Sequence, residues 1–173
     1  MDSTLRDKQR LWVSKIALEI NKYPEKGDII TFEAPSTNYI TKASANINNP
    51  VAVYNEQEKG LFTKIIESLS VFGETSYMKR VIGLPGDHIE IKDGYVYING
   101  ERLQEDYLPA GIVTDIEKAI YDDFIVPENT VFAMGDNRNH STDCRAFGCI
   151  PLEKIESKVA FRFLPLDTFG AVK

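Results

Sequence analysis

The chain has 173 residues, of which 43% are hydrophobic and 27% charged, so it can bury one sizeable core but is too short for several large domains. Its formal net charge of -6 lacks the basic excess that nucleic-acid binding requires, which argues against nucleic acid as a partner. No apolar run reaches the roughly 18 to 20 residues that cross a bilayer.

The first half of the chain predicts two strands, a loop and a helix. Apolar runs at 11–13 and 29–32 are typical of strands, and residues 36–55 are rich in the polar residues of loops. In 56–72 the apolar residues keep helical spacing behind a capping-box-like start, and Gly73 ends the helix.

From Ser76 onward the sequence alternates with a period of two. Turn signals at 85–87, 93–94 and 99–100 predict successive β-hairpins, and Asn99-Gly100 is typical of a type I′ turn. Further strands are predicted at 131–134 and 159–163. Many short strands with one helix predict a single, mainly β domain with antiparallel sheets.

The few histidines and cysteines predict neither a metal site nor a cofactor. Cys144 and Cys149 lack the spacing of a structural zinc site, and His88 and His140 fit surface or turn positions. The two cysteines could form one small disulfide loop or remain free thiols.

Candidate chemistry first appears in the strand 77–82, where two cations are adjacent in an apolar segment. Because side chains alternate along a strand, Lys79 can face a desolvated cleft while Arg80 faces away from it. Burial would lower the lysine pKa and let a neutral amine act as a general base. The alternative is a surface pair whose charged ends reach solvent.

A second candidate is the polar loop that follows the predicted strand 131–134. Asp143 and Arg145 can pair within it, and Ser141 can hydrogen-bond and orient a neighbouring amine. The alternative is an ordinary charged turn.

Taken together, these segments resemble bacterial type I signal peptidases. Residues 77–87 resemble the catalytic-lysine box of that family, 135–148 its last conserved box, and 27–32 a third box. The resemblance implies an antiparallel β-sheet fold related to the repressor proteases, with a catalytic core at 1–35 and 76–173 and a helical insertion at 36–75. It further implies a serine-lysine endopeptidase, anchored in the membrane with an extracytoplasmic catalytic domain, that removes signal peptides from exported preproteins.

The resemblance also assigns the site residues. The family's Ser-Met-x-Pro-Thr-Leu box aligns with Met1-Asp2-Ser3-Thr4-Leu5, which puts Ser3 at the proline position and the nucleophilic serine immediately before Met1. The chain as printed is therefore expected to be inactive. Lys79 is the expected general base and Ser141 orients it. The expected supports are Arg80, Asp136, Asp143 and Arg145, and the expected substrate-pocket residues are Met1, Leu5, Leu11, Tyr77 and Met78. An extended substrate is expected to pair with the Lys79 strand as an added β-strand.

Three departures from the family pattern stand out. Lys8-Gln9 replaces the usual Gly-Asp, and Cys144 stands where the family commonly has serine. The stretch 36–75 is longer than usual, and its helix can either pack on the β core or form a lid or docking surface for a pilin.

Two other functions are compatible with the sequence. A non-catalytic pilus-assembly factor that binds pilins would keep the same fold. A self-cleaving repressor-type domain would need an internal cleavage site and a DNA-binding segment, and the sequence reveals neither.

Overall fold

The computed structural model describes residues 10–14, 24–36, 45–54, 76–116, 119–164 and 170–171. Its strands are β1 (Arg10–Ser14), β2 (Ile29–Glu33), β3 (Ser76–Gly83), β4 (His88–Lys92), β5 (Tyr95–Ile98), β6 (Glu101–Arg102), β7 (Asp123–Ile125), β8 (Thr130–Met134), β9 (Ile150–Pro151), β10 (Ile155–Leu164) and β11 (Gly170–Ala171). Its short helices are η1 (Arg138–His140), α3 (Cys144–Phe147) and η2 (Leu152–Lys154).

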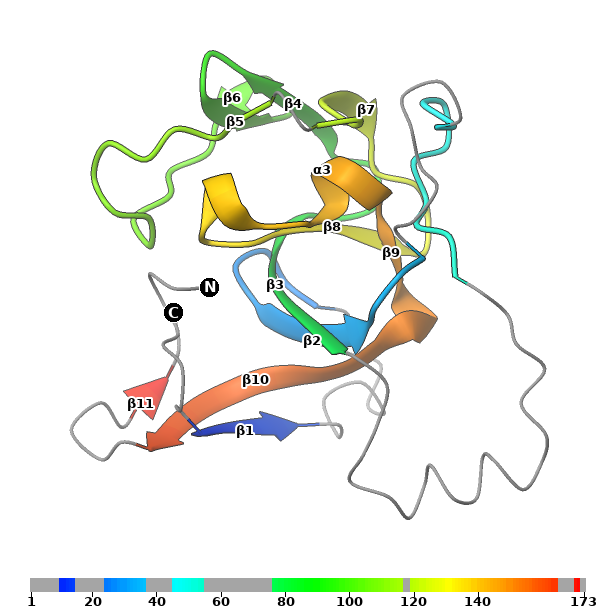
Figure 1. Cartoon of the computed structure of the whole chain (residues 1–173). Helices are drawn as coiled ribbons and strands as arrows, with labels where there is room; N and C mark the ends of the chain where they lie inside the picture. Colours follow the sequence, from blue (N-terminus) through cyan, green and yellow to red (C-terminus); the bar gives the residue numbers. More distant parts are fainter. Residues whose placement is uncertain are drawn as a thin grey trace, which may run out of the picture.

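The strands form two antiparallel sheets. The larger sheet has the order β1-β10-β2-β3-β8-β9, with β11 also paired to β10, and the smaller sheet has the order β6-β5-β4-β7. Figure 1 shows the smaller sheet on one side of β8 and α3, with β2, β3 and β10 on the other. The predicted mainly β, antiparallel class is confirmed.

The two turns of the smaller sheet follow directly from their sequences. Asp93-Gly94 has φ values of 53° and 81°, and Asn99-Gly100 has 53° and 84°. Two successive positive φ values fit a type I′ turn, whose twist suits the paired strands on either side. The hairpins β4-β5 and β5-β6 are therefore as predicted.

The hairpin prediction at 85–87 is wrong. Residues 85–86 do form a turn, with Gly86 at a φ of 85° and the carboxylate of Asp87 accepting a hydrogen bond from the Leu84 N–H. However, β3 belongs to the larger sheet and β4 to the smaller one. Because β2 and β8 already pair with the two edges of β3, the chain leaves this sheet instead of folding back along it.

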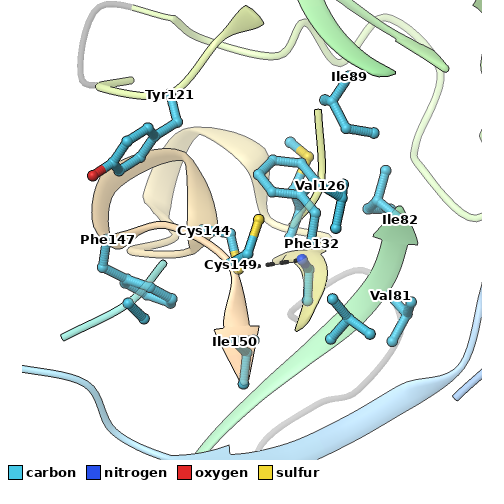
Figure 2. Close-up of a cluster of buried hydrophobic side chains, with 14 of the residues drawn as sticks. Val81, Ile82, Ile89, Tyr121, Val126, Phe132, Cys144, Phe147, Cys149 and Ile150 are labelled. Carbon is cyan, nitrogen blue, oxygen red and sulfur yellow. Dashed lines mark hydrogen bonds between the residues drawn. The ribbon is translucent and has the colours of Figure 1, made fainter. Parts of the chain in front are cut away.

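One apolar core joins the two sheets. Figure 2 shows residues of β3, β4, β8 and α3 meeting around Phe132, whose ring centroid is 5.2 Å from that of Phe124 in the smaller sheet. Val81, Phe132 and Met134 are fully buried. Burial of this shared apolar surface is the main term that holds the sheets together.

Part of the predicted insertion packs against the core. The Ala52 N–H donates to the Cys149 carbonyl over 2.8 Å, and the Cys149 N–H donates to the Pro50 carbonyl over 2.6 Å. The helix predicted at 56–72 lies outside the described residues, so its role and the boundaries of the insertion stay predictions. Within the described part of the chain, no helix is long and apolar enough to cross a membrane.

Candidate active site

Strand β3 carries the two predicted cations on opposite faces. Arg80 is 2% exposed, whereas Lys79 is half-buried. In the ladder with β2, Lys79 lies directly opposite Ile30, which is completely buried. Directly opposite residues share a sheet face, so the apolar stem of Lys79 is flanked by an apolar side chain.

The surroundings of Lys79 disfavour its charged form. Its pKa is lowered from the ordinary value of 10.5, first because burial removes water from the ammonium group. Asp143, the largest of the opposing influences, raises the pKa, and the positive charge of Arg145 lowers it further. The Lys79 Nζ also lies 5.4 Å from the ring centroid of Tyr77. The direction of the shift is the one that a lysine base needs.

Ser141 packs against Gly135, directly after β8. The β3-β8 ladder ends where Arg80 pairs with Met134, so Lys79 and Gly135 are the next residues along the two strands. A Cβ on Gly135 would lie 2.1 Å from Ser141 Oγ. Ser141 therefore occupies the space that a side chain at position 135 would need.

The Ser141 hydroxyl is buried without a hydrogen-bond partner among the described residues. The structure thus places Ser141 against Gly135 but not in a hydrogen bond with Lys79. The orienting role assigned to Ser141 stays a prediction.

The predicted support residues form two buried ion pairs. Arg80 Nε donates to Asp136 Oδ1 over 3.0 Å and its NH2 donates to Oδ2 over 2.8 Å, while NH1 donates to the Gly27 carbonyl over 2.9 Å. Arg80 and Asp136 are 2% and 1% exposed. The planar, two-point contact with Asp136 joins β3 to the loop after β8. The hydrogen bond to Gly27 joins β3 to the turn before β2.

The second pair, Asp143 with Arg145, shapes the polar loop itself. Asp143 Oδ1 accepts hydrogen bonds from the Arg145 backbone N–H and Nε, and Oδ2 accepts from Arg145 NH2 and from the Gly135 N–H. Asp143 is also the N-cap of α3. The predicted pairing of Asp143 with Arg145 is confirmed. Through its hydrogen bond from Gly135 and its capping of α3, Asp143 also joins the two ends of the loop that contains Ser141.

A third buried cation was missed by the sequence analysis. Arg138 is 2% exposed, and its NH1 and NH2 groups form a two-point contact with Glu105. NH1 also donates to Thr114 Oγ1 over 2.8 Å, and the ring of Tyr107 lies 4.1 Å from the guanidinium carbon of Arg80. These contacts tie the 105–114 segment to the site. The motif contained Arg138, but no local pattern identifies a partner 33 positions away in the sequence.

Tyr77 and Met78 occupy different environments on β3. The Tyr77 ring packs edge-on against Phe32 at 6.1 Å and lies 6.4 Å from Phe147, so it forms part of an aromatic cluster on the Lys79 face. Met78 is half-buried and alternates to the opposite face. Met1 and Leu5 lie outside the described residues, and for Leu11 only the backbone, in β1, is described.

The backbone beside Lys79 has an open edge. Residues 77–79 pair with β2, whereas pairing with β8 begins at Arg80. No strand in the described part of the chain pairs with residues 77–79 on that second side. A strand edge of this kind can accept an extended peptide.

The cysteines are free thiols, both fully buried. Cys144 Sγ accepts a hydrogen bond from the Ala133 N–H over 3.2 Å. Burial raises the pKa of Cys149 to about 12 and that of Cys144 well above its ordinary value, so neither is a reactive thiolate. Within the described ranges, no three metal-ligating side chains come together.

Comparison with known proteins identifies the family. The family model "Signal peptidase, peptidase S26" matches residues 1–164. The chain belongs to this family. A probable signal peptidase I-2 of Synechocystis is 29% identical over 98% of the chain and 62% of its own length. A signal peptidase IB of Staphylococcus aureus is 30% identical over 98% of the chain and 75% of its own length. The chain thus spans less than two thirds of the first of these relatives.

A structural comparison found a signal peptidase I from Enterococcus faecalis V583. It is 27% identical, with a TM-score of 0.48, over 80% of this chain and 98% of the other.

Proposed function

We propose that the chain is the catalytic part of a serine endopeptidase that removes N-terminal signal peptides from exported preproteins. The observation that carries the proposal is Lys79, half-buried with a lowered pKa at the open edge of β3. A neutral amine there can accept a proton, which an ammonium cannot. The nucleophile is a serine in the position before Met1, where the resemblance of the first five residues to the nucleophile box puts it.

In this mechanism Lys79 takes the hydroxyl proton as the serine oxygen attacks the carbonyl carbon of the scissile peptide bond. The resulting lysine ammonium gives the proton to the leaving amine, which completes the acyl-enzyme. Lys79 then takes a proton from water, which attacks the ester, and returns that proton to the serine. Ser141 orients the amine, while Arg80 with Asp136 and Asp143 with Arg145 hold the two boxes in place.

The substrate binds as an added strand along residues 77–79, next to small apolar pockets. Met1, Leu5, Leu11, Tyr77 and Met78 line these pockets, which suit the small residues before a signal-peptide cleavage point. The natural protein is anchored in the membrane and exposes this domain on the extracytoplasmic side. We further propose that it is one domain in which 36–75 is an insertion, and that the insertion's helix docks on the core.

The test uses the chain extended by a serine before Met1 and a matched chain extended by alanine. Each is incubated with a preprotein whose signal peptide ends in Ala-x-Ala, and the cleaved product is sequenced. We expect cleavage only with serine, its loss in Lys79→Ala, and its retention in Lys92→Ala, a lysine on the exposed face of β4. Cleavage that survives Lys79→Ala would refute the proposed base. Pilin binding without cleavage in any variant would favour the pilus-assembly role.

A further inference from the structure

A small cavity borders Ser141 and is separate from the open edge of β3. Its volume is about 130 Å³, and its walls include Ala119, Arg138, Ser141, Asp143, Arg145 and Ala146. A water molecule takes up about 30 Å³ in the liquid, so the cavity has room for a few water molecules, and its polar wall rather than its size selects the occupant.

Two polar groups of its wall lack partners within the described part of the chain. They are Ser141 Oγ and Arg138 Nε, and both atoms are buried. The other guanidinium nitrogens of Arg138 are held by Glu105 and Thr114, so the side chain cannot turn to satisfy Nε without giving up those bonds. Buried polar groups in native proteins are almost always hydrogen-bonded, often to an ordered water.

The charges of the wall favour a neutral ligand. Arg138 is paired with Glu105, and Arg145 is paired with Asp143. Asp115 also lines the cavity, so no net positive charge remains for an anion. A ligand that can accept from an N–H and bond to a hydroxyl is required, and water fits this description.

We propose that an ordered water binds in this cavity between Arg138 Nε and Ser141 Oγ, and that Arg138 thereby positions the hydroxyl beside Lys79. The water accepts one hydrogen bond from the Nε–H and one from the Ser141 O–H. Because the Ser141 hydroxyl donates its hydrogen bond to the water, its oxygen is oriented to accept a hydrogen bond from an N–H of the Lys79 amine. This second half rests on the proposed function, whereas the water site does not.

The water site can be tested by NMR on the chain with 15N-labelled arginine, without any assay of cleavage. The Arg138 Hε signal is assigned by its loss in Arg138→Lys. We expect it to exchange slowly and to show a cross-peak to a long-lived water. Ala146→Leu, which fills the cavity, should abolish this cross-peak, and Ala110→Leu, the same change at an exposed position outside this cavity, should keep it.

The water site and the positioning role of Arg138 can be refuted independently. A protected Hε without a water cross-peak, a cross-peak that persists in Ala146→Leu, or a chloride-dependent shift of Nε would overturn the water site. The positioning role predicts that Ala146→Leu shifts the NMR titration midpoint of Lys79 relative to Ala110→Leu. An unchanged midpoint after loss of the water would overturn that role. Failure of the peptidase proposal would appear in the cleavage assay, on which the water cross-peak does not depend.

Discussion

Gly135→Ala tests the close packing of Ser141 on Gly135. The added Cβ would lie 2.1 Å from Ser141 Oγ and 2.6 Å from Ser141 Cβ. Ser141 Oγ must then retreat by about 1.4 Å before an ordinary contact of about 3.5 Å is restored. Overpacking of this kind costs about 1–3 kcal/mol of stability.

The matched control combines Gly135→Ala with Ser141→Gly, which removes the side chain that the new Cβ would meet. Ser141→Gly alone removes both clashing atoms and should cost about 0.5–1 kcal/mol, through the greater backbone freedom of glycine. In the double variant, Gly135→Ala should cost little because Ser141 no longer blocks the space. The expected coupling energy between the two changes is therefore about 1–3 kcal/mol.

Urea unfolding of the four proteins, followed by circular dichroism, measures these free energies. The serine-extended forms of the same proteins report on cleavage. The double variant should regain stability but not activity, since it lacks the Ser141 hydroxyl. A Gly135→Ala protein as stable as the parent, or one that Ser141→Gly does not rescue, would refute the packing argument.

Three further predictions follow from the buried groups. Arg80→Ala leaves Asp136 as an unpaired buried charge and should lower the free energy of unfolding, measured by urea titration, by about 3–5 kcal/mol. A loss below about 1 kcal/mol would mean that the pair is not buried in solution. Cys144 and Cys149 should react with a thiol reagent at pH 8 only after denaturant is added, and rapid labelling of the native protein would contradict their burial. The pKa of Lys79 is lower in the folded than in the unfolded chain. Between these two pKa values the unfolded chain therefore binds more protons than the folded one. The free energy of unfolding should then rise with pH across a window that ends at 10.5. Lys79→Met should remove that part of the rise, and an identical pH slope in both proteins would contradict the shift.

Local sequence patterns predicted much of the fold. Asp93-Gly94 and Asn99-Gly100 gave the correct hairpins because a type I′ turn depends on the residues of the turn itself. Asp143 and Arg145 are two positions apart, so their pairing could also be seen in the sequence. The pattern failed at 85–87, where a similar turn connects two sheets, because the partner of a strand is decided by the whole sheet.

The candidate site was predictable only in part. The alternation of Lys79 and Arg80 follows from strand geometry, and the resemblance supplied Ser141 and the support residues. The contact of Arg138 with Glu105 and Thr114 joins distant segments, and nothing local marks it. The close packing of Ser141 on Gly135 likewise depends on how the loop folds back over β8.

The protonation of Lys79 tests its role as the general base most directly. Its side-chain pKa can be measured by NMR titration of the Cε and Hε resonances, with the exposed Lys92 as an internal reference. Burial lowers the pKa of Lys79, and the hydrogen bond to Glu90 raises that of Lys92, so Lys79 should lose its proton below pH 10.5 and before Lys92. A midpoint for Lys79 at or above that of Lys92 would contradict the assignment of Lys79 as the general base.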